Sequence, residues 1–350
     1  MLDETLISSR PSNWEDVAVL AAELVSLIGS PSFHHEIVEP VSCLTNVANK
    51  LRGKRFSCIF DLTGWLSLAA KELFPDTQIV EEFSLSRIRQ VSSPKLETTG
   101  YLLSMSIPEI NQARQSLDLT RPLVIDDVSF SGRTGLATMR LWGLGPEKTT
   151  HAFLIANTGN FGERNEGAVG LLTGLGSEVV SGFDIKTPKD DGWHLKDLHQ
   201  NPNLEQAFVL AIAYQEIIKQ KGKESEAANN FFSLETVKQV LFPDQLTSEG
   251  IIRLSQEGRF LLLSHQLTNN QEIHAKNPFL WASPYFHEHI DIDRVLENQC
   301  RITGILSNLH RLTSNPEGKR EAVRELQAEV RDKIPGPLEG QLFINSERMR

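Results

Sequence analysis

Residues Pro122-Leu-Val-Ile-Asp-Asp-Val-Ser-Phe-Ser-Gly-Arg-Thr134 decide how the rest of this chain is interpreted. The run opens with apolar residues typical of a buried strand, which ends at two adjacent acids, Asp126 and Asp127. A short loop rich in serine and glycine follows, and Gly135 to Trp142 then predict a helix that Gly143 ends. Strand, loop and helix in this order indicate one unit of an α/β fold.

The loop has the chemistry of an anion site. Backbone N–H groups at a helix N-terminus carry partial positive charge, which favours phosphate, and Gly132 lets the backbone approach it closely. Asp126 and Asp127 fall at the carboxyl end of an expected parallel strand, where α/β sheets bind ligands, and they can accept hydrogen bonds from vicinal sugar hydroxyls. Side-chain hydroxyls come from Ser129, Ser131 and Thr134. The combination predicts a site for ribose 5-phosphate.

The stretch Leu123 to Thr134 resembles the phosphoribosyl-pyrophosphate (PRPP) pattern of the type I phosphoribosyltransferases. The resemblance implies a pentosyltransferase that moves a phosphoribosyl group from PRPP to an acceptor nitrogen and releases pyrophosphate. It implies that Asp126 and Asp127 hold the ribose hydroxyls and place negative charge near the developing cation. It implies Mg²⁺ as the cofactor, bound mainly through PRPP. The 5′-phosphate is assigned to Phe130, Ser131, Gly132, Arg133 and Thr134, with Ser129 beside them.

A second turn fits the same family. Asp61-Leu-Thr-Gly-Trp65 follows an apolar strand and precedes a helix, as the pyrophosphate loop of phosphoribosyltransferases does. The N–H groups of Thr63 and Gly64 are therefore candidates to hold an anion at the helix start. An ordinary turn between strand and helix is the alternative.

The polar run Ser84 to Thr99 predicts an irregular loop. It is similar to the mobile loop of the hypoxanthine-guanine branch of the family, which implies a lid that excludes water from the reacting centre. Arg87 is the candidate cation for pyrophosphate, and Arg89 and Lys95 are further ones. A solvated surface loop is the alternative.

The base site is less well marked. After the expected last strand, Gly182 to His194 lies where many family members carry an aromatic residue against the nucleobase, and Trp193 is the candidate here. His194 or Asp191 could touch base edges. One departure from the hypoxanthine-guanine branch matters, because Phe130 stands where that branch has a catalytic Asp. The resemblance therefore does not imply a purine acceptor.

Three regions follow from the periodicity. Residues 51–200 alternate strand and helix, which predicts a phosphoribosyltransferase-like α/β core with a mainly parallel sheet of five or six strands. Residues 1–50 predict an N-terminal helical segment, and residues 201–350 a helical C-terminal extension. The expected strands are 56–60, 78–83, 101–106, 122–125, 150–156 and 177–181, and the expected later helices are 204–219, 233–241, 247–256, 290–311 and 319–332.

Composition limits the class of protein. The chain has 350 residues, 40% of them hydrophobic, and a net charge of −10, which disfavours a nucleic-acid binder. No apolar run is long enough to span a membrane, no signal-peptide pattern follows Met1, and the three cysteines are far apart, so we expect a cytoplasmic protein without a membrane partner. A homo-oligomer is compatible with these data. His34-His35 and His287-Glu-His289 lack the spacing of a helical metal pair.

Two other classes of function remain open. The domain could be a regulator that senses PRPP and passes the signal to the C-terminal helices. It could also be an interaction protein that keeps the fold alone. The intact acids and phosphate loop argue against complete loss of ligand binding, because core packing does not require them.

Overall fold

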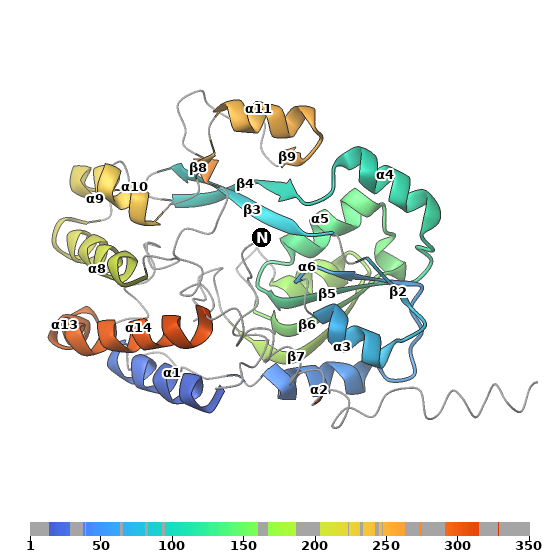
Figure 1. Cartoon of the computed structure of the whole chain (residues 1–350), viewed down its shortest axis with the longest axis horizontal. Coiled ribbons are helices and arrows are strands. Elements are labelled where there is room, and N and C mark those ends of the chain that lie inside the picture. Colours follow the sequence, from blue (N-terminus) through green and yellow to red (C-terminus); the bar gives the residue numbers. More distant parts are fainter. Residues whose placement is uncertain are drawn as a thin grey trace, which may run out of the picture.

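A computed structural model describes most of the chain from Trp14 to Ser314, with gaps. The described residues are 14–28, 38, 40–63, 66–80, 83–92, 95–159, 167–186, 204–222, 224–231, 234–241, 245–246, 248–262, 273–274, 291–314 and 328. Figure 1 shows an α/β half on the right and a helical half on the left, with a long hairpin above and between them.

The centre of the α/β half is a five-stranded parallel sheet of order β2-β1-β5-β6-β7. Parallel neighbours need crossover connections, which helices supply here, so the predicted α/β class and parallel sheet are confirmed. The strands are β1 (Cys58–Asp61), β2 (Gln78–Val80), β5 (Pro122–Ser129), β6 (Thr150–Asn157) and β7 (Glu178–Ile185). Because all of them run the same way, their carboxyl ends meet along one edge.

Helices cover both faces of this sheet. On one face, α2 (Pro40–Leu51) and α3 (Leu66–Leu73) pack on a buried apolar cluster that includes Ile59, Leu123 and Ile125. On the other face lie α4 (Ile107–Ser116), α5 (Arg133–Trp142) and α6 (Ala168–Gly174). The α4 helix was not expected, although Ser106 and Glu109 form a reciprocal capping box at its start.

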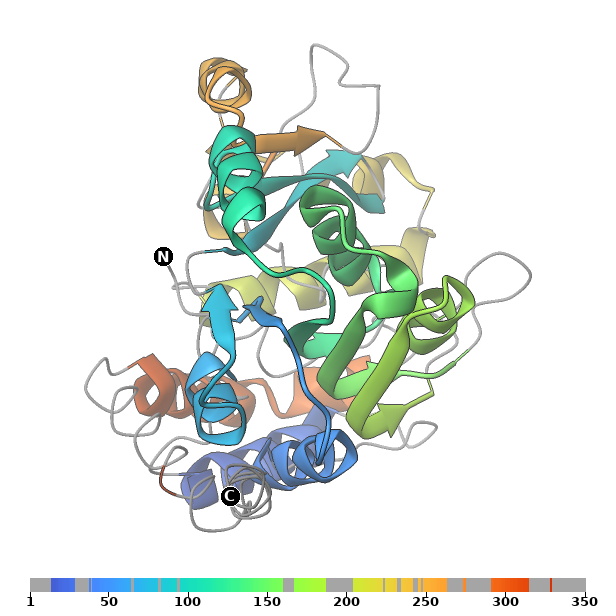
Figure 2. The ribbon, with the colours of Figure 1, turned by 90° about the vertical axis from the view of Figure 1, so that its right-hand side faces the viewer.

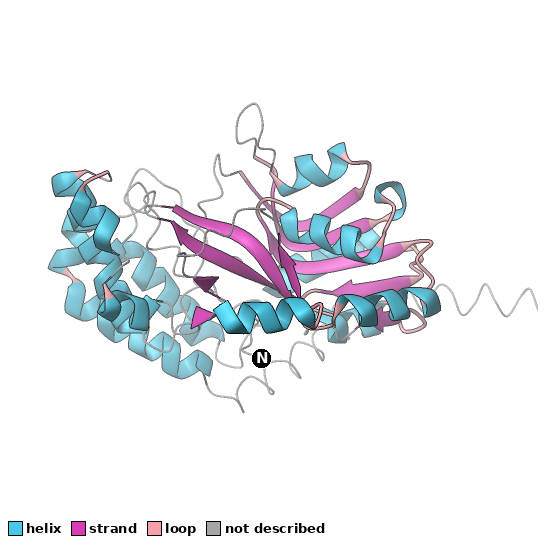
Figure 3. Ribbon diagram, turned by 90° about the horizontal axis from the view of Figure 1, so that it is seen from above, coloured by secondary structure: helices cyan, strands magenta, loops and turns pink. Residues whose placement is uncertain are grey.

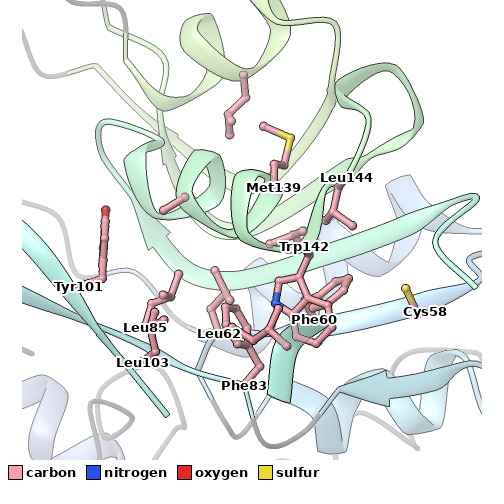
Figure 4. Close-up of a cluster of buried hydrophobic side chains, with 14 of the residues drawn as sticks. Cys58, Phe60, Leu62, Phe83, Leu85, Tyr101, Leu103, Met139, Trp142 and Leu144 are labelled. Carbon is pink, nitrogen blue, oxygen red and sulfur yellow. The ribbon is translucent and has the colours of Figure 1, made fainter. Parts of the chain in front are cut away.

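An aromatic group is the centre of the second face. The Trp142 ring lies 4.9 Å from Phe60 and 5.3 Å from Phe83, measured between ring centroids, and all three side chains are buried. Figure 4 shows these rings beneath α5, with Leu85, Leu103 and Tyr101 of the hairpin extending the same cluster. The α5 side of the parallel sheet and the inner face of the hairpin therefore share one hydrophobic core.

The expectation of an irregular loop over Ser84 to Thr99 was wrong. The chain there forms β3 (Leu85–Ser92) and β4 (Lys95–Leu103), paired as an antiparallel hairpin. Strands from the C-terminal region extend it to a second sheet of order β8-β10-β3-β4-β9. The added strands are β8 (Gln245–Leu246), β9 (Phe260–Leu262) and β10 (Ile273–His274). The polar composition of the hairpin resembles that of a loop. The strands that flank it lie far away in the sequence, so local patterns did not reveal it.

The helical half combines a helix from the N-terminal region with helices from the C-terminal region. Its helices share a buried cluster to which Leu24, Tyr214 and Leu306 belong. Figure 3 shows this half at one end of the molecule, with the hairpin strands reaching toward it. The helices are α1 (Trp14–Ile28), α8 (Leu204–Lys221), α9 (Glu226–Phe231), α10 (Glu235–Leu241), α13 (Ile292–Glu297) and α14 (Gln299–Ser314).

Most of the expected helices in the terminal regions are present, with one correction. The single helix expected over 290–311 is divided into α13 and α14 at Asn298, whose N–H still bonds to Arg294 and Val295. The helix expected over 247–256 is α11 (Ser248–Gln256), which stands above the hairpin in Figure 1. The helix expected over 319–332 lies outside the described residues, apart from Ala328. Among the described helices, none combines the length and apolar character needed to cross a membrane.

The turn after α11 fastens the C-terminal region to the hairpin. Arg259 O accepts from Leu103 N–H at 2.9 Å, and Gly258 O accepts from Ile107 N–H at 2.9 Å. The Arg259 guanidinium also donates to Ser104 O at 3.1 Å and lies 3.7 Å from the Glu109 carboxylate. Figure 2 shows α4 beside the orange segment that carries α11 and β9. The end of β4 and the start of α4 are therefore both held by this turn.

One polar residue of the core stands out. His151 on β6 is fully buried, stacks on Phe153 at 6.0 Å, and makes no hydrogen bond with either ring nitrogen in the described structure. A Cβ added to Gly135 would lie 3.0 Å from its ring, so glycine leaves the imidazole its space. Burial lowers the pKa of His151 to about 4, which keeps the ring neutral at pH 7.

The buried imidazole predicts a loss of stability in acid. The pKa of about 4 in the folded chain is lower than the ordinary histidine value of 6.5, so the unfolded chain takes up the proton first as pH falls. We expect about 3 kcal/mol of folding free energy to be lost between pH 6.5 and pH 4. Urea unfolding across this range would measure it, with His151→Phe as the comparison that keeps a ring. Equal pH dependence in both proteins would contradict the prediction.

Candidate functional site

The predicted phosphate loop joins β5 to α5 at the carboxyl edge of the parallel sheet. Gly132 adopts a left-handed conformation with φ of 70°, and its carbonyl accepts from Leu136 N–H at 3.0 Å, the first bond of α5. Phe130 O accepts from Ala168 N–H at 2.7 Å, which ties the loop to the start of α6. The backbone of Phe130 therefore anchors the loop.

Gly132 has a packing role that the sequence did not indicate. A Cβ at this position would lie 3.3 Å from Ala168 Cα, Ala168 O and Leu172 Cγ. The space that glycine keeps open is thus filled by α6 rather than by a ligand. A left-handed conformation is also strained for other residues. Gly132 is required by the fold whatever the loop binds.

The start of α5 offers donors without a side-chain cap. Gly132 occupies the cap position and supplies no capping hydrogen bond. The Ser131 hydroxyl oxygen is buried and has no hydrogen-bond partner within the described structure, which is unusual for a buried polar atom. Arg133 is exposed and Thr134 half-buried in the first turn. Helix N–H groups and a hydroxyl lacking a partner are the chemistry that phosphate binding uses.

The two acids lie within β5, which continues to Ser129 instead of ending at Ile125 as expected. Asp126 pairs with Phe153 of β6, while β1 ends opposite Ile125, so in the described pairings this part of β5 has a strand neighbour on one side only. Ser129, assigned to the loop, is the buried last residue of the strand. The acids therefore lie beyond the last residue of β5 that pairs with β1.

The environments of the acids differ. Asp126 is half-buried, and its Oδ1 accepts from Asp127 N–H at 2.9 Å. Asp127 is only 4% exposed, and its Oδ1 accepts from Val128 N–H at 2.6 Å. Successive strand residues point to opposite faces, so Asp126 follows Val124 toward the α5 side. A sugar in contact with both acids would have to lie across the end of the strand.

The turn after β1 is held by its own side chains. Asp61 is fully buried, and its Oδ1 accepts from both Thr63 N–H at 2.9 Å and the Thr63 hydroxyl at 2.7 Å. The Thr63 hydroxyl in turn accepts from Leu66 N–H at 3.1 Å, which caps α3. Because Thr63 N–H is already donated, it does not have the free-donor role expected of it. Gly64, the other predicted donor, lies outside the described residues.

A third loop at this edge escaped the sequence analysis. Asn157, the last residue of β6, is fully buried, and its Oδ1 accepts from Gly159 N–H at 2.8 Å. Gly159 O then accepts from Gly167 N–H at 2.8 Å, next to the residue that holds the phosphate loop. The signal was available, because Asn-Thr-Gly after an apolar strand is typical of a turn.

The remaining candidates are only partly described. Arg87 lies in β3 opposite Tyr101 of β4, and Arg89 pairs with His274 of β10, but their side chains are outside the described set. Lys95 opens β4 opposite Ser92. The base-site candidates Trp193, His194 and Asp191 fall outside the described residues. The candidates whose side chains are described therefore lie at the ends of β1 and β5, next to the unpredicted loop after β6.

No family model, curated protein or solved structure matches this chain. Among the described residues, no cluster of three or more His, Cys, Asp or Glu side chains could hold a metal ion.

The packing of Gly132 can be tested against a matched glycine. Gly53 has a similar φ of +77° but nothing within 4 Å of an added Cβ. We expect Gly53→Ala to cost about 1 kcal/mol, from backbone strain alone, and Gly132→Ala about 2–3 kcal/mol because α6 must also shift. Denaturant unfolding of both variants measures the difference. Equal losses would show that α6 does not restrict this position.

Proposed function

We propose that this protein transfers a phosphoribosyl group from PRPP to an acceptor nitrogen and releases pyrophosphate. The observation that carries the proposal is the loop between β5 and α5, where two acids near the end of the strand are followed, after a short loop, by a helix start without a side-chain cap. The buried Ser131 hydroxyl, which has no partner among the described residues, adds a donor to that loop. This arrangement suits a sugar phosphate, because it offers N–H groups to the phosphate and carboxylates to the hydroxyls.

The roles of the acids follow from their environments. Asp126, half-buried on the α5 side, is assigned to direct contact with ribose hydroxyls. Asp127 is almost fully buried and bonded to Val128 N–H, so its carboxylate also maintains the backbone at the strand end. Their negative charge would favour the positive charge that develops on the ribose during transfer.

The reaction replaces one bond at the anomeric carbon with another. The bond from this carbon to the pyrophosphate oxygen breaks, a bond to the acceptor nitrogen forms, and that nitrogen loses a proton. Mg²⁺ bound to PRPP oxygens and water would neutralise the leaving group, and the Asp126 carboxylate is an oxygen donor of the kind it accepts. The protein's part is to orient the sugar and to exclude water, which competes with the acceptor.

We assign the lid to the hairpin β3–β4 together with its neighbours. In the second sheet β3 pairs with β10 and β4 pairs with β9. The hairpin therefore cannot move unless these hydrogen bonds break or the neighbouring strands move with it. Arg87, in the middle strand β3, remains the candidate cation for pyrophosphate. A lid of this kind would close as a sheet rather than as a loop.

A PRPP-sensing regulator is the second candidate, and the same pairing favours it. The C-terminal strands β9 and β10 contact the hairpin directly, so a ligand-induced shift of the hairpin would reach the C-terminal region. Release of pyrophosphate from PRPP in the presence of a panel of bases separates the two functions. An enzyme consumes PRPP, whereas a sensor binds it unchanged.

The acid assignment predicts a selective loss of PRPP affinity in Asp126→Asn. Hydrogen bonds to a charged group contribute about 1.5–3 kcal/mol, so we expect affinity to fall roughly 10- to 100-fold. Calorimetry with PRPP and Mg²⁺ measures it. The matched control is Asp118→Asn, because Asp118 also bonds a backbone N–H, that of Thr120 at 2.9 Å, but precedes β5 at the opposite edge. Unchanged affinity in Asp126→Asn would refute the ribose assignment.

The lid assignment predicts a pattern of hydrogen exchange. If the sheet closes as one body, PRPP and Mg²⁺ should slow exchange in peptides of β3 and β4 and also in peptides covering β9. Exchange mass spectrometry of the full chain with and without PRPP tests this, with α14 peptides as the internal reference. Protection of the hairpin alone would contradict closure as a sheet.

A further inference from the structure

Tyr101 carries a buried hydroxyl that the proposed function does not use. The residue is 1% exposed, and its hydroxyl has no hydrogen-bond partner in the described structure. Buried tyrosines usually place the hydroxyl against a donor or acceptor, because burying one without a partner costs free energy. Such a group calls for an explanation, and an absent ligand is one.

The position of Tyr101 is fixed from both sides. It lies in β4, opposite Arg87 of β3 on one edge and opposite Leu261 of β9 on the other. Side chains alternate along a strand, so Tyr101 shares a face with Leu103. That face is buried in the cluster formed with α5. The tyrosine is therefore held on the inner surface of the second sheet by the other strand of its hairpin and by β9 from the C-terminal region.

Figure 4 shows where Tyr101 lies relative to the end of α5. In Figure 4, Tyr101 lies at the opposite end of the cluster from Trp142 and Leu144, which mark the end of α5. Its hydroxyl points away from the hairpin strands in the same view. The α5 helix begins at its other end, at Arg133, and the loop with Ser131 directly precedes that start.

The same cluster contains a second buried polar group without a hydrogen-bond partner, and its surroundings differ from those of Tyr101. The indole nitrogen of Trp142 also has no partner among the described residues, but its ring is enclosed by the aromatic rings of Phe60 and Phe83. Tyr101 has no ring of that group beside it in Figure 4. Its hydroxyl is therefore the better candidate for a ligand contact.

We propose that the Tyr101 hydroxyl donates a hydrogen bond to the phosphate group held by the β5–α5 loop. This inference rests on the proposed function and adds a binding residue from the second sheet. A neutral donor suits a phosphate oxygen, because bonds to charged acceptors are stronger than those between neutral groups. It also gives β9 a part in binding, since β9 pairs with the backbone that positions the tyrosine.

The variant Tyr101→Phe tests the hydroxyl alone. We expect the affinity for PRPP with Mg²⁺, and equally for ribose 5-phosphate, to fall about tenfold. The melting temperature without ligand should stay the same or rise, because a buried donor that has no partner is removed. The control is Tyr214→Phe, which makes the same change at a fully buried tyrosine in the helical half and should leave PRPP affinity unchanged.

The outcomes separate this inference from the proposed function. If the wild type binds PRPP and Tyr101→Phe binds it equally well, the tyrosine contact is wrong and the proposed function stands. A lower melting temperature with unchanged ribose 5-phosphate affinity would assign the hydroxyl to folding instead and also overturn the contact. If the wild type binds neither PRPP nor ribose 5-phosphate, the proposed function fails and the inference fails with it.

Discussion

The pairing of β5 on both of its edges is the constraint on which the candidate site depends. Hydrogen bonding to β1 on one side and β6 on the other brings the carboxyl ends of three strands to one edge. Because β1 stops opposite Ile125, the later part of β5 extends beyond it, and the acids lie in that extension. The loop then enters α5 through the left-handed Gly132, which lies against α6. The strand register, the length of β5 and Gly132 together position the two acids and the phosphate loop.

Local patterns in the sequence predicted the elements that local forces determine. The apolar runs of β1 and β5, the helical spacing of α1 and α3, and the closing Gly143 all depend on residues close in sequence. The prediction failed where contacts with segments distant in sequence determine the secondary structure. The hairpin β3–β4 has a polar composition typical of loops, and its backbone is satisfied by partners from the C-terminal region. The residues near Arg87 in the sequence do not indicate which distant strands pair with the hairpin.

The candidate site shows the same division. The residue types of the loop were readable, and the structure gathers Asp126, Ser131 and the start of α5 at one sheet edge. What the sequence could not supply was which groups are already engaged. Thr63 N–H is used by Asp61, and the space beside Gly132 is used by α6. A motif lists donors and acceptors, whereas the folded chain determines which of them remain for a ligand.

The C-terminal region is therefore not a separate appendage to the α/β half. Its strands complete the sheet that contains the hairpin, and Gly258 and Arg259 bond to the junction of β4 and α4. A hairpin alone gains and loses order easily, because isolated two-stranded sheets are marginally stable. Because β9 and β10 flank this hairpin, both of its edges are paired. More hydrogen bonds would therefore have to break for it to open. The cost of moving the hairpin thus depends on segments more than a hundred residues away, and in the proposed lid these segments would control access to the strand ends.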